Sequence, residues 1–167
     1  MLRGNSVKKI KDDTHTLEDM KSSIDDRSKL TKQLIHPNEK WVMDRLKKCS
    51  DISNIKAITK SNDPNQLLGK DGGYPSATYF TVPQLTKDKN ADPVQLGTDG
   101  DGCIEVYKNI DDAKTRCDYL KSFDDSILPT GSYSLIGTMI VRTSYQLDDA
   151  SQYNLTDEIF SSLTNSH

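Results

Sequence analysis

The segment that most constrains the fold is residues 132–143, SYSLIGTMIVRT, because as an extended chain it is apolar on both faces. Side chains alternate along a strand, so Leu135, Met139 and Val141 share one face, and Ile136 and Ile140 share the other. A strand with two apolar faces usually runs through the middle of a sheet. We therefore predict one central strand over 132–143.

Three more strands are predicted upstream of this segment. Each is rich in β-branched or aromatic residues and is bounded by turn residues such as Gly, Pro and Asn. The polar segment 84–101 between the second and the third is predicted to be a long loop. The predicted strands cover residues 55–59, 77–82 and 102–107.

Three helices are predicted where a capping residue precedes an apolar stripe, at Asn38, at Asn109 and near Asp148. The order is therefore helix, three strands, helix, strand, helix. It predicts an α+β fold with an antiparallel or mixed sheet of about four strands and helices packed on one face. The stripes are Val42, Leu46 and Cys49; Ile110, Ala113, Cys117 and Leu120; and Tyr153, Thr156, Ile159, Phe160 and Leu163.

Residues 1–36 differ from the rest of the chain in being polar, with few apolar side chains. Leu17, Met20 and Ile24 have helical spacing, but Arg27 and Thr31 stand where the next apolar residues belong. We predict a flexible amino-terminal arm over 1–36 and a single α+β domain over 37–164. The alternative for the arm is a short coiled-coil or partner-binding helix.

The charge balance bears on the class of partner. The chain has 22 Lys and Arg against 25 Asp and Glu, a net charge of -3, which argues against a nucleic-acid binder. No run of about 18 apolar residues is present, and Met1 to Lys9 lacks the apolar region of a signal peptide. We expect no nucleic-acid partner and no membrane span.

Three cysteines, Cys49, Cys103 and Cys117, are far apart and have no histidine nearby, which argues against a zinc site. An odd number leaves at least one thiol free in a monomer. Since Cys49 and Cys117 both lie on inward stripes of helices, a Cys49–Cys117 disulfide is the alternative to buried free thiols.

The residue patterns of the sequence argue against several kinds of catalytic and metal-binding chemistry. We therefore predict no enzyme activity, no cofactor and no metal. A calcium loop starting at Asp99 needs oxygen ligands where Cys103 and Ile110 stand. Nucleophilic catalysis needs a base beside the nucleophile, and the histidines lie in the arm, at a helix entry and at the last residue. Acid pairs at 111–112, 124–125 and 148–149 are predicted mainly to cap helices. The histidines are His15, His36 and His167.

One face of the predicted sheet is a candidate binding surface. If Ile104 and Val106 face a helix, alternation directs the neighbouring side chains of two strands outward. Such a mixture of aromatic, aliphatic and Arg side chains resembles a protein interface. The alternative is that loop 84–101 or the arm covers this face, or that it pairs in a dimer. The candidate residues are Glu105, Tyr107, Ile136, Thr138, Ile140 and Arg142.

Four segments between about residues 41 and 163 are distinctive. They are GGYPSATYF at 72–80, GTDGDGCIEVYKNIDDAKTRCDYLKSFD at 97–124, GSYSLIGTMIVRTS at 131–144 and LDDASQ at 147–152. Through these segments the chain resembles a family of small, functionally uncharacterised domains that occur in secreted proteins and lipoproteins of Gram-positive bacteria and their mobile elements. The resemblance implies an extracytoplasmic location, with the arm as spacer behind a lipid-anchored or cleaved amino terminus, and implies no reaction.

Together these patterns favour a non-enzymatic, extracytoplasmic binding module whose partner is a protein or a cell-envelope component, as a monomer or a homodimer. Two alternatives stay open. One is an unusual enzyme that uses carboxylates alone, and the other is a cytoplasmic accessory protein that binds through the arm.

Overall fold

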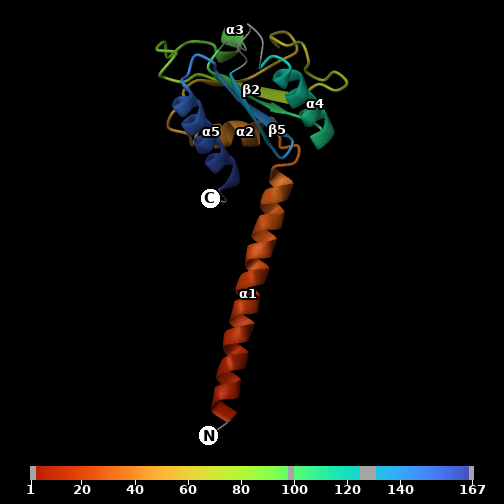
Figure 1. Cartoon of the computed structure of the whole chain (residues 1–167), viewed down its shortest axis with the longest axis vertical. Helices are drawn as coiled ribbons and strands as arrows, with labels where there is room; N and C mark the ends of the chain where they lie inside the picture. The colour runs from red at the N-terminus through yellow and green to blue at the C-terminus, as the bar shows by residue number, and fades with distance from the viewer. Residues whose placement is uncertain (1–2, 98–99, 125–130, 166–167) are drawn as a thin grey trace. The chain divides into compact units, whose positions relative to one another are not determined.

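A computed structural model describes residues 3–97, 100–124 and 131–165 of the chain. The chain divides into two compact units, of which the first ends at Gln33 and the second spans Leu34–Asn165. The first unit is a single helix of 31 residues, α1 (Arg3–Gln33), shown in Figure 1. Most of the arm predicted over 1–36 is therefore helical.

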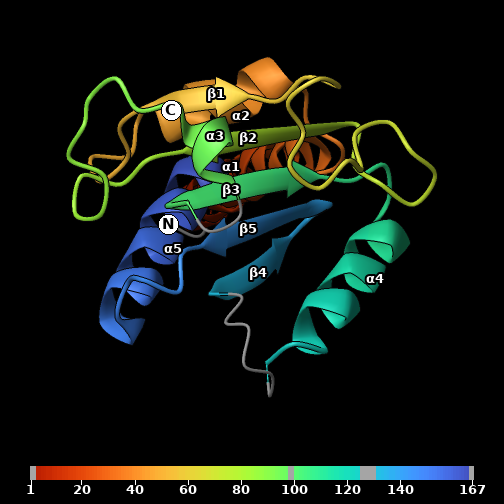
Figure 2. The same cartoon turned by 90° about the horizontal axis from the view of Figure 1, so that it is seen from above.

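The second unit is built on a five-stranded sheet in which every neighbouring pair is antiparallel. The strands lie side by side in the order β1-β2-β3-β5-β4 (Figure 2). The predicted α+β class and antiparallel sheet are confirmed. The strands are β1 (Ile55–Ala57), β2 (Ser76–Phe80), β3 (Gly102–Val106), β4 (Ser132–Ile136) and β5 (Met139–Thr143).

The prediction of one central strand over 132–143 is wrong, because this segment is a hairpin of β4 and β5. The turn consists of Gly137 and Thr138, and Gly137 has a φ of 58°. A positive φ at the first of two turn residues is typical of a type II′ turn, whose twist matches that of the strands. The turn places Ile136 opposite Met139, so that β5 is buried and β4 forms the half-buried edge of the sheet.

The three predicted helices are present, and each begins after its predicted capping residue. The side chains of Asn38, Asn109 and Asp148 accept hydrogen bonds from backbone amides three residues later, at 2.9, 2.8 and 2.7 Å. These bonds satisfy amides that have no partner inside the helix. The helices are α2 (Glu39–Leu46), α4 (Ile110–Lys121) and α5 (Asp149–Thr164), and a short further helix, α3 (Pro93–Leu96), lies in the predicted loop 84–101.

Helices cover both faces of the sheet, which corrects the prediction that they pack on one. Ile104 and Val141 belong to a core that also contains residues of α2 and α5. Cys103 and Ile140, their neighbours along the same strands, belong to a second core with α4 and the loop residue Tyr74. Because β2, β3 and β5 carry buried side chains on both faces, each face needs its own cover.

In the part of the chain that the structure describes, no helix combines the length and the apolar character needed to cross a bilayer.

Candidate functional site

The predicted binding face is not on the surface. Glu105, Tyr107 and Ile140 are fully buried, and Arg142 is 7% exposed. The prediction assumed that α4 packs on Ile104 and Val106, whereas α4 packs on the opposite face, over Tyr107 and Ile140. The sheet face that was predicted to point outward therefore lies in the second core, on the side that α4 covers.

The other two residues of the predicted face lie elsewhere, because the Gly137 turn interrupts the alternation on which the prediction relied. Ile136 packs against the first core together with Met139. Thr138 is a buried turn residue whose Oγ1 accepts a hydrogen bond from the backbone amide of His36 at 2.7 Å. Of the predicted set, the structure brings together Glu105, Tyr107 and Arg142 as one polar cluster.

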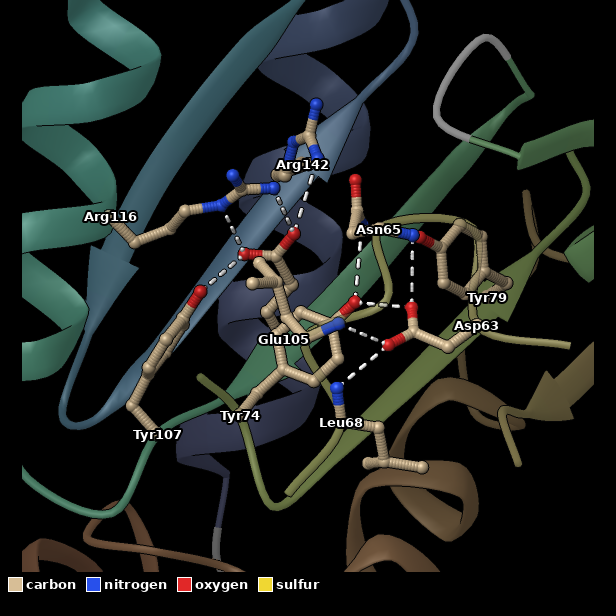
Figure 3. A network of polar contacts seen from close by, with 10 residues as sticks. Asp63, Asn65, Leu68, Tyr74, Tyr79, Glu105, Tyr107, Arg116 and Arg142 are labelled. Carbon is tan, nitrogen blue, oxygen red and sulfur yellow. Dashed lines mark hydrogen bonds and ion pairs between the residues drawn. The ribbon is translucent and has the colours of Figure 1, made fainter. Parts of the chain in front are cut away.

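Glu105 is the centre of this cluster (Figure 3). Arg116, from α4, donates to it twice, from Nε at 3.1 Å and from Nη2 at 3.0 Å. Arg142, from β5, donates from Nη1 at 3.2 Å, and the hydroxyl of Tyr107 donates at 2.9 Å. Each carboxylate oxygen therefore accepts two hydrogen bonds, and a bidentate arginine fixes the orientation of the group.

Arg116 was absent from the sequence-based site, although the sequence contains a signal for it. The residue lies on the same helical stripe as Ala113, Cys117 and Leu120, at spacings of three, one and four residues. An arginine on an inward stripe requires a buried acid as partner, since burying an unpaired charge is costly. Glu105 is that acid.

The electrostatics of the cluster favour fixed protonation states. Burial lowers the pKa of Arg116, but its hydrogen bonds to Glu105 and the charge of that carboxylate outweigh burial and raise the pKa above the ordinary arginine value. Burial and the negative charge of Glu105 both raise the pKa of Tyr107. These groups are therefore held as a guanidinium and a neutral phenol, and neither is suited to exchange protons near neutral pH.

A second polar cluster fastens the loop before β2. Asp63 accepts hydrogen bonds from the amides of Leu67 at 2.6 Å and Leu68 at 2.7 Å, and from the Tyr74 hydroxyl at 2.6 Å (Figure 3). Burial raises the pKa of Asp63, but these hydrogen bonds and one from the amide of Asn65 outweigh it and hold the pKa below its ordinary value. This carboxylate fixes the loop over the second core.

A shallow pocket of about 430 Å³ opens above the two clusters, where the loop meets α4. The guanidinium of Arg116 lines it and lies 5.2 Å from the ring centre of Tyr119. Since Arg116 is already paired with Glu105, its charge is largely neutralised and gives a ligand little to bind. The remaining lining residues are Asn65, Leu67, Gly72, Tyr107, Thr115 and Tyr119.

The Cys49–Cys117 disulfide, which was the alternative to free thiols, is absent, and all three thiols are free. Cys49 belongs to the core beneath α2 and α5, whereas Cys117 packs against the core beneath α4. The sheet separates the two thiols, because the stripes of α2 and α4 face opposite sides of it. The third, Cys103, is buried in the second core.

Thiol titration is expected to find three reactive cysteines in unfolded, unreduced protein, and only Cys117 reacting readily in the native state. Burial raises the pKa of Cys49 to about 11 and that of Cys103 to about 12, so few thiolates form at these positions at pH 8. The readout is the number of thiols that react with Ellman's reagent before and after addition of guanidinium. Two thiols or fewer in the unfolded protein would contradict the free state.

The carboxylates that might suggest a metal site have structural partners. Asp101 accepts a hydrogen bond from the amide of Val82 at 2.6 Å, and Asp148 caps α5. Over residues 3–97, 100–124 and 131–165, no group of His, Cys, Asp or Glu is arranged to hold a metal ion. Asp99, Asp125 and His167, which were also considered, lie outside the described residues.

Three exposed apolar side chains form a row among the side chains of α1 that the structure describes, those of residue 9 and residues 11–33. Leu17, Met20 and Ile24 are 66%, 57% and 64% exposed. Their spacing of three and four residues aligns them along one face of the helix, and we call them the α1 ridge. Continuing the same spacing leads to Asp13 before the ridge and Arg27 after it, both exposed. The exposed candidate site therefore lies on α1, in the polar amino-terminal part of the chain.

A scan against protein-family models and searches of curated proteins and of solved structures find no match to this chain.

Proposed function

We propose that this chain is a non-enzymatic interaction module that binds its partner through the α1 ridge. The observation that supports this most directly is the exposure of Leu17, Met20 and Ile24, each above half, on a helix whose other described side chains are mostly polar. Helices in proteins draw most of their stability from packing an apolar face, and aligned exposed apolar residues mark interaction sites. A partner that covers the ridge would supply that packing.

The polar clusters of the second unit support a structural role for its ionisable groups rather than a catalytic one. A general base needs a free lone pair within reach of a substrate proton. Both oxygens of Glu105 are filled by hydrogen bonds, and the raised pKa values of Cys49 and Cys103 disfavour nucleophilic thiolates. We infer that these clusters hold the fold in one arrangement, which suits a module that presents a binding element.

The proposed location is extracytoplasmic, and it rests on the resemblance of residues 72–80, 97–124 and 131–144 to secreted and lipoprotein domains. In this setting the partner is a protein or a cell-envelope component, and α1 is both spacer and binding element. Immunolabelling of intact source cells is expected to detect the chain. Labelling that appears only after permeabilisation would favour a cytoplasmic accessory protein that binds through the same helix.

Photo-crosslinking tests whether the ridge is the binding element. A benzoylphenylalanine placed at position 20 in the full chain is expected to form crosslinks in the source cell, because Met20 is the middle of the ridge. The matched control carries the same group at Ser22, which is exposed on the opposite side of α1. The measurement is the crosslinked fraction of each variant on a denaturing gel.

We expect position 20 to crosslink at least about fivefold more than position 22, since only the ridge side would be within reach of a partner. Replacing Leu17 and Ile24 with Asp in the position-20 variant should abolish the crosslinks. Equal yields at both positions would show that the ridge has no preferred partner and would refute the proposed function.

A further inference from the structure

We infer that the partner of the α1 ridge is a second copy of this chain, and that the two α1 helices pair antiparallel. This inference rests on the proposed function and specifies its partner. It is based on the two charged residues that flank the ridge, Asp13 and Arg27. Their charges are complementary between the two chains only when the helices run in opposite directions.

The three residues of the ridge belong to a longer series that runs from Asp13 to Arg27. Successive members of this series are four, three, four and three residues apart. Alternating steps of four and three keep side chains on the seam between two paired helices. The three apolar side chains thus occupy the middle of a seam of nearly four turns, with an acid at its first position and a base at its last. All of these side chains are exposed.

The direction of the partner helix decides whether these end charges attract or repel. In an antiparallel pair centred near Met20, Asp13 of each chain lies beside Arg27 of its partner, giving one ion pair at each end of the apolar seam. In a parallel pair, Asp13 meets Asp13 and Arg27 meets Arg27. Like charges brought together on paired helices are unfavourable, so the sequence of the seam selects the antiparallel arrangement.

The flanks of the ridge allow close approach. Three of the flanking side chains, Thr16, Ser23 and Ser28, are short, uncharged and exposed. Interaxial distances between packed helices depend on the size of the side chains at the contact, and small ones bring the axes closer. With three apolar residues from each chain, the interface is small, and we expect a dissociation constant on the order of 100 µM.

Sedimentation equilibrium of the full chain, from about tenfold below to about tenfold above this concentration, measures the association. We expect Asp13→Arg and Arg27→Asp each to weaken dimerisation about tenfold, because each creates like-charge contacts at both ends of the seam. The double variant Asp13→Arg/Arg27→Asp is expected to restore it. Glu18→Arg is the matched control, since it reverses a charge away from the ridge and should leave dimerisation unchanged.

Disulfide trapping tests the direction of pairing independently. When the Asp13→Cys and Arg27→Cys variants are mixed, the antiparallel pair is expected to give a mixed disulfide dimer, identified by mass spectrometry of the joined peptides. Each variant alone should crosslink far more slowly. Ser22→Cys on the opposite side of α1 controls for random collision and for the native thiols.

Three results would overturn the inference. They are a monomer throughout the concentration range, single variants that crosslink to themselves as fast as the mixture, and a double charge swap that does not restore dimerisation. A monomer whose position-20 crosslinks in cells join it to another protein would overturn the second-copy inference and leave the proposed function standing. A monomer without ridge-dependent crosslinks would refute both.

Discussion

Replacing Glu105 with Gln is expected to lower the free energy of unfolding by about 3–5 kcal/mol, the cost of leaving buried charges without their partner. Gln has nearly the same shape but no negative charge. Arg116 and Arg142, whose side chains are 10% and 8% exposed, would then remain charged in a site with little solvent to screen them. Their guanidinium groups would also face an amide nitrogen that donates where the carboxylate accepted.

Urea denaturation followed by circular dichroism would measure this loss. The matched control is Glu18→Gln, the same change at an exposed position of α1, which we expect to alter stability by less than about 0.5 kcal/mol. A loss below about 1 kcal/mol for Glu105→Gln would show that the cluster contributes little. The structural role assigned to these charges would then be untenable.

Replacing Gly137 with Ala is expected to destabilise the second unit by about 2–4 kcal/mol, from backbone strain together with a steric clash. Gly137 has a φ of +58°, and a Cβ built there would lie 2.0 Å from the backbone oxygen of Leu34. A backbone carbonyl cannot move aside as a flexible side chain can. The segment 34–36 is also held to this turn by hydrogen bonds to Thr138, so the clash would disturb both.

Gly72→Ala is the matched control, because Gly72 has a φ of +69° but no heavy atom within 4 Å of the added Cβ. It isolates the backbone contribution, and we expect a loss of about 1 kcal/mol, measured by the same urea titration. The Gly137 result also discriminates between folds. In an uninterrupted strand, Ala would be preferred to Gly, so an unchanged or increased stability would contradict the β4–β5 turn.

Local chemistry made much of the fold predictable from sequence. Asn38, Asn109 and Asp148 start α2, α4 and α5 because a capping side chain and the amides it satisfies lie within one turn of each other. The β2 and β3 strands follow from alternation and from β-branched or aromatic content in the same way. These signals depend only on residues that are close in the sequence. They can therefore be interpreted without knowing which helices and strands pack together.

The hairpin shows where such signals conflict. The apolar content of segment 132–143 indicates one strand. The pair Gly137 and Thr138 is compatible with a two-residue hairpin turn and so indicates two strands. The prediction of one strand relied on the apolar content alone. In the structure, β5 pairs with β3 on one side and with β4 on the other. This pairing shields β5 from solvent at both edges, which a single longer strand could do only with another neighbour.

The candidate site depended most on tertiary structure. Alternation correctly indicated that Glu105 and Tyr107 share a face, and Arg142 lies opposite Cys103 beside them. It gave no information on which helix covers that face, because both faces carry side chains able to support a core. The position of α4 turned a predicted surface into a buried charge cluster and placed Cys49 and Cys117 in different cores.

Patterns among neighbouring residues predicted where α2, α4 and α5 begin and that the second unit is α+β, and they showed that Leu17, Met20 and Ile24 have helical spacing. Each of these signals comes from residues a few positions apart in the chain. Which side chains are buried, which charges pair and which apolar residues stay exposed became clear only from the folded structure. Burial and pairing depend on contacts between residues distant in the chain, such as Glu105 with Arg142. For that reason the exposed candidate site moved from the sheet to the α1 ridge.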